Sequence, residues 1–102
     1  MIKIANTLQE IHFNGEGIAL IELAERKICI IKKGNDLYAC TASCPHASGN
    51  LSEGYIDDLG NIVCPIHQYK FCLKNGRHLG GEDYFLKTYP IKNKKDGIFL
   101  II

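Results

Sequence analysis

Two short segments, Cys44-Pro45-His46 and Cys64-Pro65-Ile66-His67, constrain this chain more than any other feature. Each segment brings one thiol and one imidazole within a few bonds of each other, and 17 residues separate the two. Together they supply four sulfur and nitrogen ligands, which are enough to complete a metal site. The fold must therefore bring both segments to one place.

The residues beside these ligands restrict the backbone. Pro45 and Pro65 each follow a cysteine directly, so they fix φ and hold the preceding cysteine in an extended conformation. Ligation then has less backbone freedom to overcome. Gly49, Gly54 and Gly76 allow sharp reversals of the chain around the site.

The bulk composition is that of an ordinary globular protein. The 102 residues are 46% hydrophobic and 23% charged, and the net charge is +1. We therefore expect one domain over residues 1–102, with no nucleic-acid partner and no membrane partner. The first residues lack a signal-peptide apolar region, which favours a cytoplasmic protein. Because cytoplasmic thiols stay reduced, the five cysteines favour metal ligation over disulfides.

Short apolar segments and tight turns predict an all-β fold with a base of antiparallel strands. Hairpin turns are expected at Lys33–Asp36 and Lys92–Gly97, a polar turn at residues 25–27, and one helical turn within Thr7–His12. Residues 42–81 hold all four candidate ligands and six of the ten glycines, so we interpret them as a metal-organised subdomain inserted into the base. The expected strands are Ile2–Ala5, Gly17–Leu23, Ile28–Ile31, Leu37–Thr41, Ile62–Cys64, Tyr69–Leu73, Phe85–Ile91 and Ile98–Ile102.

The mixed donor set favours an iron–sulfur centre. Two ferric ions and two sulfides leave two positive charges, which two thiolates cancel while neutral imidazoles add none. Such a site accepts an electron more easily than one with four thiolates. Zinc also binds two cysteines and two histidines, but zinc modules usually pair cysteine with cysteine and histidine with histidine. Zinc stays as the alternative.

The order and spacing of the ligands resemble the C-x-H…C-x-x-H pattern of Rieske-type ferredoxins, from about Ile18 to Ile102. Leu51-Ser52-Glu53-Gly54, Phe71, Gly76 and the Gly97 hairpin add to this resemblance. It implies the Rieske iron–sulfur fold with one [2Fe–2S] cluster. It also implies that Cys44 and Cys64 bind one iron, and that His46 and His67 bind the other through Nδ1 with their far edges toward solvent.

The chain departs from the high-potential members of this family. Those members join the two loops by a disulfide, but Gly49 and Ile66 stand at the equivalent positions here. They also carry a Ser and a Tyr as hydrogen-bond donors where this chain has Tyr69 and Phe71. Fewer donors predict a reduction potential at the low end of the Rieske range. Ser48, Gln68 and Cys72 also differ from the pattern, and Gln68 bears on the backbone path beside His67.

The remaining reactive side chains have simpler interpretations. Cys29 and Cys40 lie in apolar strand patterns and are expected as buried thiols, with Cys72 partly exposed. His12 and His78 are expected in solvent. The tyrosines are expected as half-buried strand residues, at positions 38, 55, 69, 84 and 89.

The resemblance implies a one-electron carrier and not an enzyme in its own right. Its expected partners are a flavin-dependent reductase as donor and a terminal oxygenase or other acceptor. One alternative keeps the cluster but makes the chain the small subunit of a larger oxidoreductase such as a nitrite reductase. The other alternative is a zinc-stabilised interaction module without a redox role.

Overall fold

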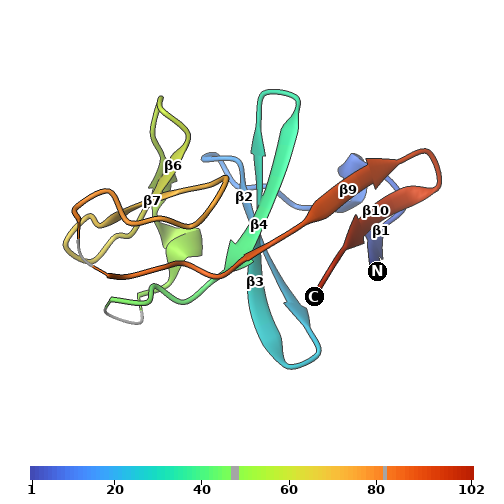
Figure 1. Cartoon of the computed structure of the whole chain (residues 1–102). Coiled ribbons are helices and arrows are strands. Elements are labelled where there is room, and N and C mark those ends of the chain that lie inside the picture. The colour runs from blue at the N-terminus through green and yellow to red at the C-terminus, as the bar shows by residue number, and fades with distance from the viewer. Residues whose placement is uncertain (47–48, 82) are drawn as a thin grey trace.

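The computed structural model describes residues 1–46, 49–81 and 83–102, and the strands in them form three antiparallel sheets (Figure 1). The all-β prediction is confirmed, and the expected helical turn near Thr7 is a single 3-10 turn, η1 (Leu8–Glu10). The strands are β1 (Ile2–Ala5), β2 (Ile18–Leu23), β3 (Arg26–Lys33), β4 (Asp36–Thr41), β5 (Tyr55–Ile56), β6 (Asn61–Val63), β7 (Lys70–Cys72), β8 (Thr88–Tyr89), β9 (Ile91–Lys94) and β10 (Gly97–Leu100), and a second 3-10 turn is η2 (Leu51–Glu53).

The central sheet, in the order β2-β3-β4-β8, is covered on both faces. Successive side chains of a strand point to opposite faces. Ile28 and Ile30 of β3 therefore enter one core, and Cys29 and Ile31 enter the other. This explains why the middle of β3 is a continuous apolar run and not an alternating one.

The two cores have different roles. The first packs the central sheet against the sheet β1-β10-β9, and the second packs it against the sheet β5-β6-β7. Cys44 and Cys64 are buried members of the second core, with 1% and 0% of their surface exposed. Packing between the central sheet and the sheet β5-β6-β7 therefore positions both candidate thiolate ligands.

Cys29 and Cys40 are buried thiols, as the sequence predicts. They face each other in the register of β3 and β4. A side-chain hydrogen bond with Cys29, together with burial, raises the pKa of the Cys40 thiol. The Cys40 thiol consequently stays protonated, and both side chains are part of the core.

Two of the predicted boundaries are wrong. The polar turn expected at residues 25–27 lies at Ala24 and Glu25, which both adopt positive φ, so β3 begins earlier than its apolar run. The strand expected over Phe85–Ile91 is divided at Pro90. Residues before Pro90 pair with β4, and residues after it pair with β10 in another sheet. Proline has no N–H for a ladder, and here it marks the crossing between sheets.

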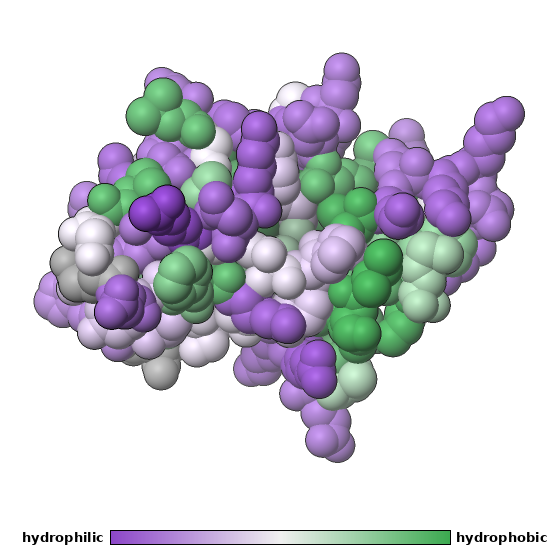
Figure 2. All heavy atoms as spheres, in the orientation of Figure 1, coloured by the Kyte–Doolittle hydropathy of each residue, from purple (hydrophilic) through white to green (hydrophobic). Residues whose placement is uncertain are grey.

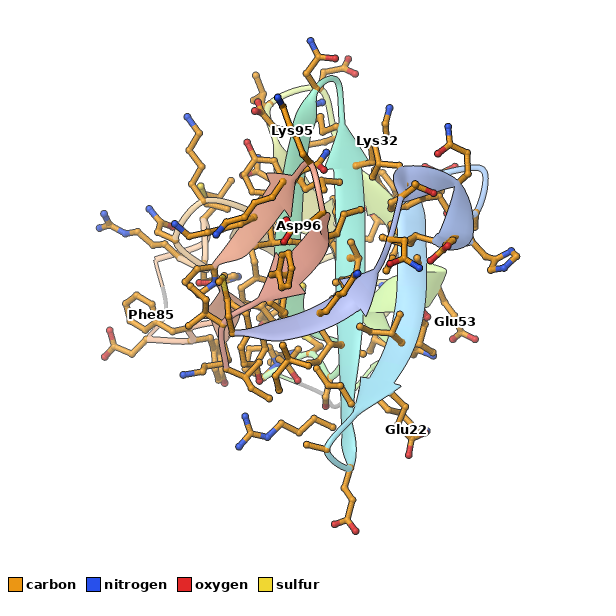
Figure 3. All side chains as sticks on the ribbon, turned by 90° about the vertical axis from the view of Figure 1, so that its right-hand side faces the viewer. Glu22, Lys32, Glu53, Phe85, Lys95 and Asp96 are labelled. Atoms are coloured by element: carbon orange, nitrogen blue, oxygen red, sulfur yellow. The ribbon has the colours of Figure 1, made fainter. Side chains whose placement is uncertain are left out.

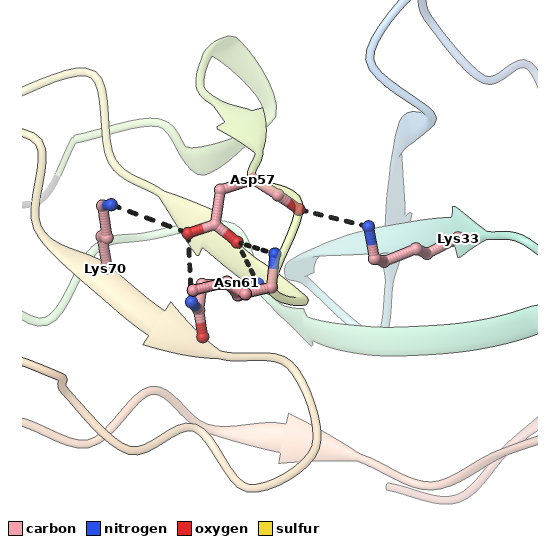
Figure 4. A network of polar contacts seen from close by, with 5 residues as sticks. Lys33, Asp57, Asn61 and Lys70 are labelled. Carbon is pink, nitrogen blue, oxygen red and sulfur yellow. Dashed lines mark hydrogen bonds and ion pairs between the residues drawn. The ribbon is translucent and has the colours of Figure 1, made fainter.

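A polar network ties the sheet β5-β6-β7 to the base (Figure 4). The Asp57 carboxylate accepts hydrogen bonds from the Leu59 N–H at 3.0 Å and from the backbone and side chain of Asn61 at 2.9 and 3.0 Å. Lys70 lies 3.7 Å from the same carboxylate. The Nζ of Lys33 in β3 donates to the Asp57 carbonyl at 3.2 Å. The sequence patterns did not identify this network.

We expect the network to make stability depend on acid pH. Burial alone would raise the pKa of Asp57, but its hydrogen bonds and Lys70 outweigh burial and lower that pKa. A lowered folded-state pKa gives stability above the unfolded value of about 3.9, and this stability is lost as pH falls through the folded value. Asp57→Asn should therefore reduce the free energy of unfolding by about 1–2 kcal/mol at neutral pH.

Thermal unfolding between neutral and acid pH measures this effect. The difference between Asp57→Asn and the wild-type protein should shrink below about pH 4. Asp58→Asn is a matched control, because Asp58 is the exposed neighbour of Asp57. A difference that stays constant down to pH 2 would contradict the account.

Glu22, Lys32 and Lys95 point outward on the base, and Phe85 projects from the opposite side (Figure 3). Apolar side chains gather beside the sheet that carries both termini, where Ile101 and Ile102 are partly exposed (Figure 2). In the described residues, no helix has the length and apolar character needed to span a membrane.

Candidate metal centre

The first candidate ligand loop leaves the end of β4. Ser43 and Asn50 form an isolated antiparallel bridge, and the Cys44 N–H donates to the Gly49 carbonyl at 2.9 Å. These contacts close the loop that holds His46. Ser48 lies in this loop but outside the described residues, so its departure from the family pattern has no structural account.

The second loop connects β6 to β7. The Cys64 N–H donates to the Tyr69 carbonyl at 2.8 Å, which closes a tight turn around Pro65–Gln68. Gly49 of the first loop passes against this one. A Cβ atom at Gly49 would lie 3.0 Å from the Cys64 Sγ atom and 3.0 Å from the Ile66 side chain. Gly49 does not adopt positive φ, so the constraint at this position is the limited space beside Cys64 and Ile66.

The end of the second loop has an unusual backbone. His67 and Gln68 both adopt the left-handed conformation, with φ of 60° and 55°. L-residues pay a steric cost there, whereas glycine does not. The structure thus explains why glycine is the expected residue at Gln68. It also shows that the backbone of Gln68 adopts the left-handed conformation although the residue is not glycine.

Gln68→Gly should therefore stabilise the protein. Relief of the left-handed strain outweighs the extra freedom of glycine in the unfolded chain, for a net gain of about 1 kcal/mol. Thermal unfolding should show a rise in Tm of roughly 5 °C. Glu25→Gly, at φ 65° in a distant hairpin, is the matched variant and should stabilise similarly. A lower Tm for Gln68→Gly would contradict the strain argument.

The two candidate cysteines form a pair. Burial raises the pKa of the Cys64 thiol, and a hydrogen bond with the Cys44 thiol raises it further, against the opposing effect of a backbone hydrogen bond with Ile66. All five cysteines are free thiols, so no disulfide joins the two loops. This agrees with Gly49 and Ile66 at the positions where high-potential members carry the bridge.

The two candidate histidines form a second pair. Their ring centroids lie 5.7 Å apart with the planes at 75°. The His46 Nδ1 atom is buried and has no hydrogen-bond partner among the described residues. A buried polar atom without a partner is costly unless another ligand satisfies it. Nδ1 of His46 is thus placed as a metal donor needs to be, while the side chain of His67 is exposed.

This donor arrangement fits a two-iron cluster. The four donors stand as a thiol pair, in which Cys44 and Cys64 share a hydrogen bond, and an imidazole pair. A [2Fe–2S] cluster takes one such pair on each iron, whereas tetrahedral zinc takes all four donors around one ion.

An aromatic cluster surrounds His46. Tyr69 stacks on the His46 ring at 3.7 Å between centroids, with the planes at 16°. Tyr69 also stacks on His78 at 4.7 Å and 20°. The expectation of a solvated His78 is wrong, because only 6% of its surface is exposed, whereas His12 is exposed as expected. Tyr69 and Tyr84 lie outside the strands, so their expected strand positions are also wrong.

Tyr69 and Phe71 stand at the positions where high-potential members carry a Ser and a Tyr as hydrogen-bond donors. Phe71 is fully buried in the second core and has no hydroxyl. The Tyr69 ring lies flat on a candidate ligand. Cys72 is partly exposed on β7, as the sequence predicts. Phe71 therefore offers no hydroxyl that could stabilise the reduced state of such a centre.

Comparison with known proteins gives a family match over most of the chain. Residues 4–90 match the family described as Rieske [2Fe-2S] domain. The ferredoxin subunit of 3-phenylpropionate/cinnamic acid dioxygenase from Escherichia coli (strain K12) is 36% identical over 87 residues, which cover 83% of this chain and 81% of that subunit. The same subunit from Shigella sonnei (strain Ss046) has the same identity and coverage.

Solved structures share the fold. The ferredoxin of carbazole 1,9a-dioxygenase from Nocardioides aromaticivorans IC177 superposes with a TM-score of 0.81 at 16% identity, covering 98% of this chain and 97% of that one. A putative small subunit of an NADPH nitrite reductase superposes with a TM-score of 0.83 at 18% identity over the whole of both chains.

Proposed function

This chain belongs to the Rieske [2Fe-2S] domain family, and from that premise we propose that Cys44 and Cys64 hold one iron while His46 and His67 hold the other. The cofactor of the family is one [2Fe–2S] cluster. The buried thiol pair and the buried Nδ1 of His46 support this assignment. We also propose that residues 1–102 are one Rieske domain whose cluster-binding subdomain spans about residues 42–81.

When bound, the cluster supplies one-electron chemistry. The chain contributes two deprotonated thiols from the second core and two imidazole nitrogens from the loop ends. Water is kept from the side of the centre that Cys44 and Cys64 would hold, because the core encloses both side chains. The exposed side chain of His67 supports a centre whose other side a partner surface can reach.

We propose that the protein carries single electrons from a flavin-dependent reductase to a terminal oxygenase. The observation that carries this proposal is the 36% identity to dioxygenase ferredoxin subunits over most of both chains. On this proposal the chain is an electron-transfer protein and not an enzyme by itself. Five free cysteines support a cytoplasmic location, where thiols stay reduced.

Purified protein tests the proposal directly. We expect a red-brown colour and a reduced-state EPR signal whose average g value lies below that of the free electron. A colourless, zinc-loaded protein would reject the cluster. Elution as a free small protein, and not with a large subunit, separates the ferredoxin from the nitrite-reductase-like alternative.

The reduction potential is the quantitative part of this test. With Phe71 and Tyr69 in place of the short hydroxyl donors, we expect a potential on the order of −150 mV or slightly higher. Protein-film voltammetry measures it. A value above roughly +100 mV would contradict the low-potential assignment.

A further inference from the structure

The rings around His46 form a defined assembly. Tyr69 is shared by two stacks, one with His46 at 3.7 Å and 16° and one with His78 at 4.7 Å and 20°. The Tyr84 ring contacts all three, with its centroid 5.4 Å from that of His46, 6.1 Å from that of Tyr69 and 6.0 Å from that of His78. We call His46, Tyr69, His78 and Tyr84 the ring assembly. Among the described ring contacts, no ring stacks on His67, and its one ring neighbour is His46.

The far end of the assembly is tightly packed. Phe71 lies 5.3 Å from the His78 ring, and His78 forms an isolated backbone bridge with Phe71. Gly80 lies close to the imidazole and leaves no room for a side chain, since a Cβ atom there would lie 2.5 Å from the His78 Cε1 atom. His78 is consequently enclosed and can hold Tyr69 against His46.

The stack has an electrostatic consequence. An imidazole bound to ferric iron carries positive charge, part of which is lost when the iron is reduced. The face of a tyrosine ring is negative and stabilises a neighbouring positive charge. Tyr69 therefore favours the oxidised centre. Covering His46 also keeps water from it, which disfavours the extra negative charge of the reduced centre.

We propose that Tyr69 is a positioning residue for His46, that His78 acts by holding Tyr69, and that the ring assembly lowers the reduction potential through His46 alone. This inference rests on the proposed ligation by His46 and His67. It assigns the two imidazoles different roles, with His46 stacked and screened and His67 exposed.

Reduction potentials of holoprotein variants test this proposal. Tyr69→Leu keeps an apolar side chain but removes the ring face, so the equilibrium constant for reduction should rise about three- to tenfold. Tyr69→Phe keeps the face and should stay near the wild-type value. His78→Leu should shift the potential in the same direction by a smaller amount, and His78→Phe should restore it.

A glycine pair tests the assembly without altering any ring. Gly80→Ala should displace the His78 ring, which then no longer holds Tyr69 against His46. The reduction potential should therefore rise, as in His78→Leu. Gly15→Ala is the matched control, since a Cβ atom at Gly15 would meet nothing within 4 Å. Pulsed EPR measures the nitrogen hyperfine couplings of the two ligand histidines. In the variants that disturb the ring assembly, the coupling of His46 should change and that of His67 should stay constant.

The outcomes are distinct. An unchanged potential in Tyr69→Leu, or an equal shift in Tyr69→Phe, overturns the role of the ring face. Loss of the cluster in Tyr69→Leu but not in Tyr69→Phe supports it, and loss in both overturns it. A wild-type protein without two histidine nitrogen couplings defeats the proposed ligation instead, before any variant is compared.

Discussion

The His46→Ala and Cys64→Ser variants should bind less than a tenth of the cluster that the wild-type protein binds. His46 offers a buried Nδ1 atom without another described partner, and alanine leaves that coordination position empty. Serine at position 64 replaces a thiolate with a hydroxyl that stays protonated at neutral pH, so the sulfur pair with Cys44 is broken. Visible absorbance and iron content per chain measure the loss.

Matched controls separate ligation from general damage. His12→Ala removes an exposed imidazole, and Cys72→Ser removes a partly exposed thiol at the end of β7. Both variants should keep a full complement of iron. Full iron content in Cys64→Ser, or a comparable loss in His12→Ala, would show that the assigned ligands are not those of the centre.

Loss of the cluster should also weaken the fold. Cys44 and Cys64 belong to the second core, so without the cluster this core holds two buried thiols that no longer bind a metal. Ligand binding to the folded state alone adds to the free energy of unfolding. We therefore expect the ligand variants to unfold at lower temperature, whereas the controls should not.

The local part of the fold could be predicted from the sequence. Gly34 and Asn35 mark a hairpin with little ambiguity, and the run Ile28–Ile31 marks a strand. The ligand set could be proposed from the sequence because each cysteine stands close to a histidine in the chain, and it stays a prediction. The hairpin and strand signals depend only on neighbouring residues, and the structure confirms both.

The part that depends on distant contacts could not be predicted. His78 lies 32 positions after His46 and joins the site only through Tyr69, so its own neighbourhood suggested solvent. Pro90 divides one apolar run between two sheets because its two sides meet different partners, β4 and β10. Neither relation has a periodic signature in the sequence.

The second large effect is expected at Gly54, which lies between η2 and β5 and closely approaches the backbone of β6. Gly54 follows η2 and lies against β6, with a backbone that is not left-handed. A Cβ atom there would lie 1.9 Å from the Val63 carbonyl oxygen and 3.3 Å from the Leu51 carbonyl oxygen. The requirement for glycine is therefore one of space.

Gly54→Ala should cost about 3 kcal/mol of folding free energy, at the upper end for overpacking, because a backbone carbonyl cannot move aside as a side chain can. The Tm should fall on the order of 15 °C. Val63 directly precedes Cys64, so its displacement also moves a ligand away from Cys44. We expect iron content to fall together with stability.

Gly15→Ala separates this contact from a general effect of adding a methyl group. Gly15 has no atom within 4 Å of the new Cβ position and does not adopt positive φ, so its variant should match the wild-type protein in Tm and iron content. Equal Tm values for the two alanine variants would contradict the close approach of Gly54 to the Val63 carbonyl. A Gly54→Ala protein that loses stability but keeps all its iron would show that the Val63 carbonyl can yield without moving Cys64.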